Sequence, residues 1–338
     1  MDASPDPSRR VTIYDVATVA GVSPSTVSRA LSRPGRISAL TADKIRAAAD
    51  ALGYQRLAGL PSGEPAELRL LVMLVNDIGN PVFVELIRGV EAVADAAGYT
   101  VVLLDSRESH VRERLVEEFF PAVSGLILAS PRLSDSGIRM LAKTRPLIVL
   151  NRAVHGVPSI LADTARGART AAQHLHELGH REIAYLAGPE TSWANGMRWR
   201  SLQEAGSDLS IRVRHSGPNQ PTVSGGVAAA AWWEQHRSSA VLAFNDVVGA
   251  GFMQAAKERG IDVPDDASVI AFDNSQLASL VSPGLTSIAA PSRKQGEAAA
   301  RSLIEIIDGG RPDPTPLYLP TRLITRASTG PAAGAPRT

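Results

Sequence analysis

From residue 68 onward, short apolar runs alternate with longer segments whose apolar residues recur at helical spacing. Each predicted helix is followed by a glycine, a residue that commonly ends helices. The predicted helices include 82–97, 164–178 and 247–259, and the predicted strands span 70–75, 101–104, 126–128, 147–150, 183–186, 241–244 and 269–272. This alternation predicts an α/β fold with parallel sheets covered by helices on both faces, which bind ligands at the carboxyl ends of the strands.

The first sixty residues follow a different, all-helical pattern. Thr12 can cap a helix that Gly21 ends, and Ser23 can cap a second helix that begins at Pro24, where a missing N–H costs nothing. In the second helix, the inward side is Val27, Ala30 and Leu31, and the outward side is Ser25, Thr26, Ser28 and Arg29. With a third helix that ends at Gly53, this is a small all-α helix-turn-helix domain, although the pattern alone leaves open a bundle without a ligand.

The charge of the chain is divided unevenly. Between Arg9 and Arg46 there are seven basic and two acidic residues, a net charge of +5, so the remainder of a chain with a total of +1 carries −4. A basic head on a mildly acidic body is typical of a DNA-binding module carried on a sensor, although a solvated charged surface would give the same count.

Several short motifs carry a family resemblance. In the head they are 11–17 (Val-Thr-Ile-Tyr-Asp-Val-Ala), 20–23 (Ala-Gly-Val-Ser), 26–31 (Thr-Val-Ser-Arg-Ala-Leu) and 52–54 (Leu-Gly-Tyr), and in the body they include 80–83 (Asn-Pro-Val-Phe), 183–189 (Ile-Ala-Tyr-Leu-Ala-Gly-Pro) and 244–246 (Phe-Asn-Asp). The head motifs closely resemble the headpiece of the LacI/GalR family of transcriptional regulators. The body resembles that family's periplasmic-binding-protein-like sensor, which implies two lobes of parallel sheet with a ligand cleft between them.

The resemblance implies roles for individual headpiece residues. Pro24, Ser25 and Arg29 match recognition-helix positions that meet base edges in the major groove, where an arginine fork on guanine discriminates by about 1–3 kcal/mol. The other candidate DNA-binding residues of the headpiece are Thr12, Tyr14, Ser23, Thr26 and Ser28. The hydroxyls of the serines and threonines are expected to position the phosphate backbone, with helix capping as their alternative role.

The segment after Tyr54 departs from the family pattern. The family continues with Pro-Asn and a hinge helix that ends Ala-Arg-x-Leu, whereas here the Pro-Asn is missing and Ala58-Gly59-Leu60 is one residue short. Pro61 would also end a helix almost as it begins. Leu60 is the candidate for an apolar wedge in the minor groove of the DNA, and a plain flexible linker is the alternative.

The resemblance also implies effector contacts in the body. Arg198 matches an arginine that binds effector hydroxyls or carboxylates, Asp273 and Asn245 match donors and acceptors on the opposite strands, and Phe83 could stack on a ring. Further candidates are Asn76, Asp77, Asn151 and Trp193. The alternatives are that Asp273 and Asp246 cap helices, that Asn151 ends a strand, and that Phe83 belongs to the core. Ser201 stands where the family usually has glycine, so a sugar, a sugar acid and a related metabolite all stay open as the effector.

The predicted organisation has two domains. The boundaries are a helix-turn-helix domain over 1–54 with 1–9 expected to be disordered, a linker or hinge over 55–67, an effector-binding and dimerisation domain over 68–330, and a tail over 331–338. Within the larger domain, lobe 1 is expected to comprise about 68–162 plus 290–320, and lobe 2 about 163–289 plus 321–330.

Other classes of protein find little support. The chain has no cysteine, which excludes disulfides and thiolate sites, and no apolar stretch near the roughly 20 residues of a membrane span. The acidic N-terminus lacks a secretory pattern, so a cytoplasmic location without a membrane partner is expected. The motif Gly249-Ala250-Gly251 begins a dinucleotide fingerprint, but Gln254 replaces its third glycine. His174, His176 and His180 diverge in direction, and neither a metal nor a cofactor is expected.

These observations predict a transcriptional repressor that is not an enzyme. Two chains would bind a pseudo-palindromic operator in double-stranded DNA, with a tetramer left open, and a small molecule between the lobes would control binding as inducer or corepressor. The alternative function is a sugar-binding or sugar-converting α/β protein without regulatory DNA binding.

Overall fold

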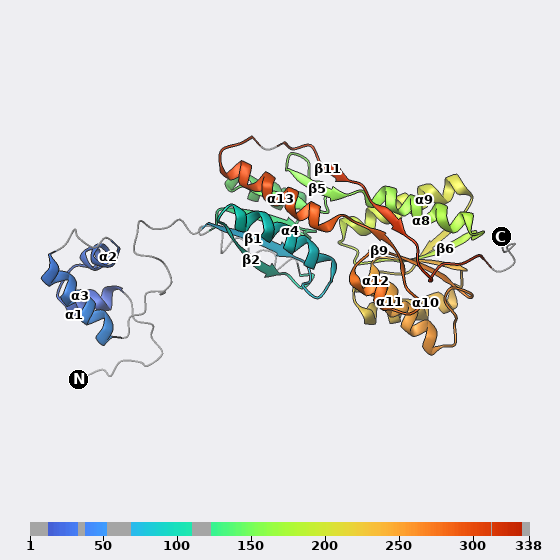
Figure 1. The fold of residues 1–338 in the computed structure, drawn as a ribbon, viewed down its shortest axis with the longest axis horizontal. Coiled ribbons are helices and arrows are strands. Elements are labelled where there is room, and N and C mark those ends of the chain that lie inside the picture. Colours follow the sequence, from blue (N-terminus) through green and yellow to red (C-terminus); the bar gives the residue numbers. More distant parts are fainter. Residues whose placement is uncertain (1–12, 33–37, 53–68, 110–122, 312, 333–338) are drawn as a thin grey trace. The chain divides into compact units, whose positions relative to one another are not determined.

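The computed structural model describes residues 13–32, 38–52, 69–109, 123–311 and 313–332. The chain divides into two compact units, Met1–Arg69 and Leu70–Thr338, which are described separately (Figure 1). No helix in the described ranges is both long and apolar enough to cross a membrane.

The described part of the first unit contains three helices. Its helices are α1 (Ile13–Ala20), α2 (Pro24–Ser32) and α3 (Ala39–Ala51). Val16, Val27 and Ile45, one from each helix, are fully buried against one another in a small core. Gly21 lies between α1 and α2 with a φ of 66°, a left-handed conformation that favours glycine, so the helix-turn-helix prediction is confirmed.

The second unit contains two six-stranded sheets, one in each lobe. The lobe 1 sheet has the order β11-β5-β4-β3-β1-β2, from strands β1 (Leu70–Val75), β2 (Thr100–Asp105), β3 (Gly125–Ala129), β4 (Leu147–Leu150), β5 (Ser159–Ala162) and β11 (Leu317–Leu319). The lobe 2 sheet has the order β12-β10-β9-β8-β6-β7, from strands β6 (Glu182–Leu186), β7 (Arg212–His215), β8 (Ala240–Ala243), β9 (Ser268–Asp273), β10 (Thr286–Ala289) and β12 (Arg322–Ile324). All neighbours pair in parallel except β12, which is antiparallel to β10, so the predicted α/β class is confirmed.

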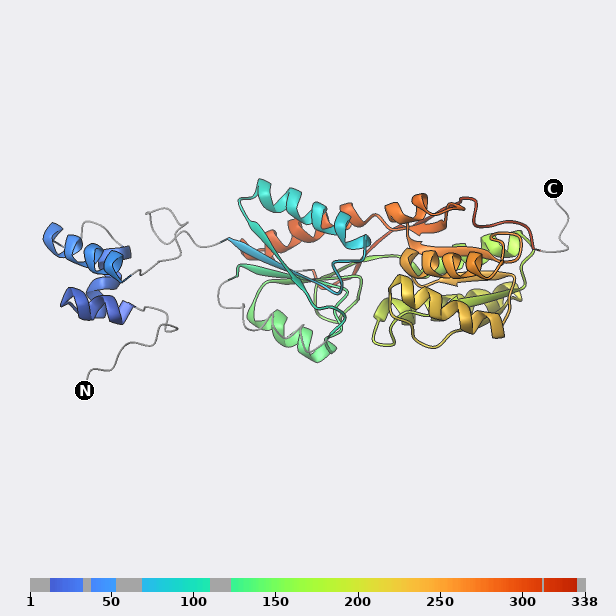
Figure 2. The ribbon, with the colours of Figure 1, turned by 90° about the horizontal axis from the view of Figure 1, so that it is seen from below.

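Helices cover both faces of each sheet, as Figure 2 shows. Lobe 1 has α4 (Val82–Ala96), α7 (Asp135–Thr144) and α13 (Ser292–Ile307), and lobe 2 has α8 (Thr164–Glu177), α9 (Trp193–Leu209), α10 (Val223–Gln235), α11 (Asp246–Glu258) and α12 (Gln276–Leu280). Alternate residues of β1 point to opposite faces. Met73 packs in the core under α4 and α13, whereas Leu74 packs in the core under α7. Strands buried on both faces must be apolar throughout, which explains the continuous apolar runs in the sequence.

Among the described elements, the chain crosses between the lobes from β5 to α8, from β10 to α13 and from β11 to β12. Two of the crossings are hydrogen-bonded to each other. The Asp163 N–H donates to the Leu319 carbonyl at 2.9 Å, and the Thr321 hydroxyl donates to the Asp163 carbonyl at 2.9 Å. The crossings bring the carboxyl ends of strands from both sheets to one region, where the candidate site lies.

Candidate functional site

The start of α2 gathers the hydroxyl groups of the headpiece. The Ser23 hydroxyl caps the helix by accepting the Thr26 N–H at 3.2 Å, and it lies 2.9 Å from the Ser25 hydroxyl and 2.8 Å from the Thr26 hydroxyl. Ser25 is exposed, and Pro24 is partly exposed. Exposed hydroxyls beside a helix N-terminus form a suitable surface for a phosphate group.

The remaining headpiece candidates are less completely described. Tyr14 lies on α1 with 66% of its surface exposed, so its phenol is accessible. Ser28 and Arg29 belong to α2, but their side chains lie outside the described part of the structure. Thr12 and Leu60, together with the whole linker prediction over 55–67, lie outside the described residues.

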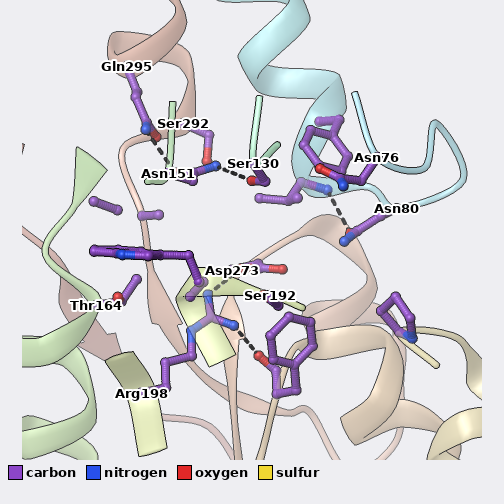
Figure 3. A pocket seen from close by; sticks show the side chains of 18 of the residues that line it. Asn76, Asn80, Ser130, Asn151, Thr164, Ser192, Arg198, Asp273, Ser292 and Gln295 are labelled. Carbon is purple, nitrogen blue, oxygen red and sulfur yellow. Dashed lines mark hydrogen bonds and ion pairs between the residues drawn. The ribbon is translucent and has the colours of Figure 1, made fainter. Parts of the chain in front are cut away.

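A cavity in the second unit is lined by residues from both lobes, and it encloses about 710 Å³ including its mouth (Figure 3). Its polar lining is Asn76, Asn80, Glu108, Ser130, Arg132, Asn151, Ser292 and Gln295 from lobe 1, with Thr164, Ser192, Arg198 and Asp273 from lobe 2. Its other lining residues include Val82, Phe83, Ala162, Trp193, Pro221 and Phe244. A cavity with apolar walls and a few placed polar groups is typical of a site for a small ligand.

Arg198 of α9 is the centre of the lobe 2 wall. Its guanidinium lies 4.1 Å from the centre of the Phe272 ring and 4.9 Å from that of Phe244, donates to the Phe244 carbonyl, and lies 3.6 Å from the Asp273 carboxylate. The side chains of Arg198 and Asp273 are only 8% and 11% exposed. Two rings, a carbonyl and a carboxylate therefore hold the arginine in one orientation at the cavity.

A second carboxyl lies behind Asp273. Asp246 accepts the Ser275 N–H at 2.6 Å, the Ser275 hydroxyl at 2.8 Å and the Ser287 hydroxyl at 2.6 Å. Burial and the neighbouring charge of Asp273 raise the pKa of Asp246 to about 7, although these hydrogen bonds oppose the shift. Burial likewise raises the pKa of Asp273, against the influence of Arg198. The lobe 2 wall is thus one buried arginine in front of two carboxyl groups.

The lobe 1 wall contains a chain of hydrogen-bonded amides and hydroxyls, visible in Figure 3. The Gln295 amide donates to the Asn151 side-chain oxygen at 2.8 Å and to the Ile160 carbonyl at 2.8 Å. The Asn151 amide donates in turn to the Ser130 hydroxyl at 3.1 Å. Asn151 directly follows β4, which ends at Leu150, and it also lines the cavity.

Lobe 1 also contributes an ion pair that the sequence did not indicate. The Arg132 guanidinium contacts both oxygens of Glu108, at 2.9 Å from Nε to Oε2 and 3.1 Å from Nη2 to Oε1, and it also donates to the Ser130 carbonyl at 3.2 Å. The two side chains are 5% and 18% exposed. Each follows a strand of the sheet, which is the only signal that could have suggested them.

Asn76 and Phe83 lie near each other in lobe 1. Asn76 follows β1, lines the cavity and is 2% exposed, and neither atom of its amide has a hydrogen-bond partner among the described residues. Phe83 is 4% exposed, and it both packs in the core under α4 and lines the cavity. Trp193, the first residue of α9, lines the lobe 2 side and is partly exposed.

Unfavourable backbone conformations gather around this cavity. Glu108, Ser130, Asn151 and Asp273 all have positive φ, at 58°, 59°, 60° and 102°, and all four line it. A positive φ is costly for residues other than glycine and is tolerated where the surrounding structure enforces it. Such residues cluster at functional sites, which agrees with the placement of this cavity.

Two of the predicted effector contacts do not line the cavity. The Asn245 side-chain oxygen caps α11 by accepting the Val248 N–H at 2.9 Å, and its amide nitrogen is buried without a partner in the described structure. The Asp77 carboxylate accepts the Gly79 N–H at 2.8 Å and so holds a turn. A helix cap and a turn account for the side-chain oxygens of these residues.

His180 has a structural environment. Its ring nitrogens lie 2.8 Å from the Ser239 hydroxyl, 3.1 Å from the Ser268 hydroxyl and 3.0 Å from the Gly330 carbonyl. Burial lowers its pKa. These contacts join β9 to the C-terminal segment and leave the imidazole no role at the cavity.

Comparison with known proteins places both units in recognised groups. A family of bacterial regulatory proteins, the lacI family, matches residues 12–56, and a periplasmic binding protein-like domain matches residues 172–329. The HTH-type transcriptional regulator DegA of Bacillus subtilis (strain 168) is 30% identical over 95% of this chain and 99% of its own length. The ribose operon repressor of Halalkalibacterium halodurans is 31% identical over 94% of this chain and 97% of its own length.

Solved structures show the same likeness. A complex of the transcriptional regulator CelR with cellobiose is 28% identical, with a TM-score of 0.69 over 94% of this chain and 100% of that chain. The Lac repressor dimer bound to operator and the anti-inducer ONPF is 26% identical, with a TM-score of 0.71 over 95% of this chain and 100% of that chain. A regulator from Enterococcus faecium with bound ribose is 30% identical, with a TM-score of 0.69 over 78% of this chain and 99% of that chain.

Proposed function

The chain belongs to the LacI family of bacterial regulatory proteins, and from this premise we propose that it is a repressor whose affinity for operator DNA is controlled by a small polyhydroxyl molecule in the cavity between its lobes. The observation that carries the proposal is the joining, in one chain, of a helix-turn-helix headpiece to a cavity lined by both lobes. A DNA-binding domain without the cavity would have no means of sensing a metabolite.

The position of the cavity supports control by a ligand. Ala162, Thr164, Ala290 and Ser292 line it at or beside two of the crossings between the lobes. A molecule bound there contacts both lobes and would favour one arrangement of them over another. It changes DNA affinity only as far as it binds one arrangement better, typically by about 1–3 kcal/mol.

The effector contacts that we propose are those predicted residues that line the cavity, namely Asn76, Phe83, Asn151, Trp193, Arg198 and Asp273. Arg198 and Asp273 offer charged hydrogen-bonding groups, and Phe83 and Trp193 offer apolar surface. Since ribose and cellobiose occupy two of the similar structures, a sugar is the first class of effector to test. No further cofactor is part of the proposal.

On the DNA side, we propose a homodimer on a pseudo-palindromic operator, as in the similar Lac repressor dimer bound to its operator. Pro24, Ser25 and Arg29 would meet base edges, and Thr12, Tyr14, Ser23, Thr26 and Ser28 would contact the phosphate backbone. Leu60 would enter the minor groove. Such a protein acts in the cytoplasm, where the chromosome is, and its relatives' regulatory names support a role in regulation rather than catalysis.

The experiment that tests this function selects operator sites from a random DNA pool with the full-length protein. The expected sites carry two inverted half-sites about one helical turn apart, and Arg29→Ala relaxes the preference at one base pair of each half-site by about 1–3 kcal/mol. Arg200→Ala, at an exposed arginine of α9, is the control and leaves the preference unchanged. Equal affinity for selected and random DNA at every salt concentration would overturn the proposal.

A further inference from the structure

Asp246 is a buried carboxyl group that does not line the cavity in the described structure. It is 1% exposed, at the first position of α11. An acidic residue in the first turn of a helix is common at the surface, where it interacts with the helix dipole. Asn245 already caps α11, however, and a carboxyl group is costly to bury. The helix alone therefore does not account for Asp246.

The carboxyl group of Asp246 holds the turn that follows β9. Asp273 and Asn274 have positive φ values of 102° and 50°, which are unfavourable for residues other than glycine. Ser275, the next residue, donates its N–H and its hydroxyl to Asp246 at 2.6 Å and 2.8 Å. The Ser287 hydroxyl accepts the Asn274 N–H at 3.0 Å and donates to Asp246 at 2.6 Å. Asp246 thus binds the turn both directly and through Ser287.

The same turn carries a residue of the cavity. Asp273 lines the cavity and lies 3.6 Å from Arg198, so the conformation of the turn determines where its carboxylate lies. On the turn, the Arg326 guanidinium donates to the Asn274 side-chain oxygen at 2.7 Å. Asp273, Arg198 and Arg326 are therefore the ionisable groups that these contacts bring to the turn beside Asp246.

We propose that Asp246 is a positioning residue for the effector, which holds Asp273 in place and makes the effector affinity depend on pH. The inference rests on the proposed function, because it takes the cavity to be the effector site. Two buried carboxyl groups share one arginine, Arg198, so ionising both leaves a buried net negative charge. Burial and the charge of Asp273 raise the pKa of Asp246 to about 7, which places its ionisation in the neutral range. No histidine is among the described residues that line the cavity.

A polyhydroxyl ligand is expected to raise the pKa of Asp246 further. A ligand hydroxyl that donates to Asp273 stabilises the ionised form of Asp273, and an ionised Asp273 opposes the ionisation of Asp246. The ligand also displaces water from the cavity, which strengthens the repulsion between the two carboxylates. A group whose pKa rises on binding takes up protons, so the affinity for the ligand falls as the pH rises above about 7.

The test is calorimetric titration of the full-length protein with D-ribose and with cellobiose, the sugars present in two similar structures. Titrations at about pH 7.5 in phosphate and in Tris, which differ in their heats of ionisation, give the number of protons exchanged. The wild type is expected to take up a fraction of a proton on binding. Its sugar affinity is expected to fall by about threefold or more between about pH 6 and about pH 8.5.

Two substitutions separate positioning from titration. Asp246→Asn keeps an acceptor for Ser275 and gains a donor for Ser287, so it is expected to bind sugar as the wild type does at about pH 6 and to keep that affinity at about pH 8.5, without proton uptake. Asp246→Leu removes the acceptors, and it is expected to lower sugar affinity by about tenfold or more. The control is Asp208→Asn, at an exposed carboxylate of α9 paired with Arg169, which is expected to leave the affinity and the proton uptake unchanged.

A purely structural role for Asp246 would affect stability and leave no pH dependence in sugar binding. The inference is overturned if the wild type takes up no proton, if the uptake persists in Asp246→Asn, or if neither sugar binds. Should Asp246→Leu fail to fold, the wild type and Asp246→Asn still decide between these results.

Operator affinity measured in parallel keeps the two proposals distinct. If a sugar binds with a pH dependence that Asp246→Asn removes, but leaves operator affinity unchanged, the proposed function fails and this inference stands. If a sugar alters operator affinity and binds without proton exchange, the proposed function stands and this inference fails.

Discussion

The two walls of the cavity differ in their chemistry. The lobe 2 wall is built on charge, with Arg198 held between Phe244 and Phe272 and paired with Asp273 in front of Asp246. The lobe 1 wall is built mainly on neutral groups, with a chain of amides and hydroxyls, one ion pair that is complete in itself, and the unpartnered Asn76.

From this difference we expect the lobe 2 wall to orient a bound ligand and the lobe 1 wall to select which ligand binds. In lobe 2, removing one of the buried charged residues Arg198, Asp273 and Asp246 leaves the remaining charges without a partner. This cluster is therefore suited to holding a ligand in one fixed orientation. In lobe 1, most of the polar groups form hydrogen bonds with other groups of the same lobe, and single substitutions there are expected to cost little stability. We therefore expect this wall to determine which ligand is accepted. The comparison predicts large effects of substitution in lobe 2 and smaller ones in lobe 1.

The largest effect is expected for Arg198→Ala. The substitution leaves Asp273 buried beside Asp246 without its cation, and it is expected to lower the free energy of unfolding by about 3–5 kcal/mol and to abolish sugar binding. Urea unfolding followed by tryptophan fluorescence measures the first effect. The control Arg200→Ala, on the same helix but exposed, is expected to stay within about 0.5 kcal/mol. If Arg198→Ala lowered the free energy of unfolding by less than about 1 kcal/mol, the proposed difference between the two walls would be wrong.

An intermediate effect is expected for the lobe 1 ion pair. Arg132→Ala leaves Glu108 partly buried and unpaired, which is expected to cost about 2–3 kcal/mol in urea unfolding. The double variant Glu108→Leu with Arg132→Leu removes both charges and is expected to cost less than Arg132→Ala.

The equivalent double variant in lobe 2 sharpens the contrast. Asp273→Leu with Arg198→Leu is not expected to recover stability, because position 273 has a φ of 102°, a conformation that leucine rarely adopts. Equal recovery by the two double variants would show that the walls do not differ in this way.

The pH dependence of stability tests the two carboxyls of lobe 2. Because the pKa of Asp246 is raised to about 7, the folded state holds a proton that the unfolded state releases at lower pH. The free energy of unfolding should therefore fall as the pH rises from about 4 to about 7.

Asp246→Asn removes that titration. The stability of the wild type relative to Asp246→Asn should decrease with rising pH over this range and become constant above about pH 8. Urea unfolding of both proteins at a series of pH values measures this difference in the free energy of unfolding. A difference that stays constant or grows with pH would contradict the assignment of a raised pKa to Asp246.

The smallest effect is expected for Gln295→Leu. The variant removes the hydrogen bonds to the Asn151 side chain and the Ile160 carbonyl, and it is expected to cost about 1 kcal/mol in urea unfolding. The neighbouring Lys294→Leu on α13 provides a control for a change of side chain at the same end of the helix. A cost as large as that of Arg198→Ala would show that the lobe 1 amides form one unit and are not exchangeable.

Periodicity predicted the layers of the fold but not all of its strands. The runs at β1, β4 and β8 are continuous and apolar because both faces of these strands are buried, and each was predicted. The strand β7, with the sequence Arg-Val-Arg-His, was not predicted, because it lies at a sheet edge and none of its residues is buried. The strands β11 and β12 have three residues each, too few to show a period.

The site could be predicted in part for a similar reason. Arg198 and Asp273 follow from the family motifs, and both line the cavity. The pairing of Glu108 with Arg132 joins residues 24 positions apart, and that of Gln295 with Asn151 joins residues 144 positions apart. Such contacts depend on which strands become neighbours, and no local pattern contains that information. The lack of partners for Asn76 likewise appears only when its surroundings are known.

The central claim is that a ligand in the cavity and operator DNA both shift one equilibrium, the one between two arrangements of the lobes. The most direct test combines two titrations. In the first, a labelled operator is titrated with the full-length protein at fixed salt, with and without a saturating sugar, and fluorescence anisotropy gives the operator affinity. In the second, calorimetry gives the affinity for the same sugar with and without the operator. Thermodynamic linkage requires the sugar to change the operator affinity by the same factor by which the operator changes the sugar affinity, and we expect a factor of about 5 to 150. An operator affinity that is unchanged at saturating sugar would contradict the account.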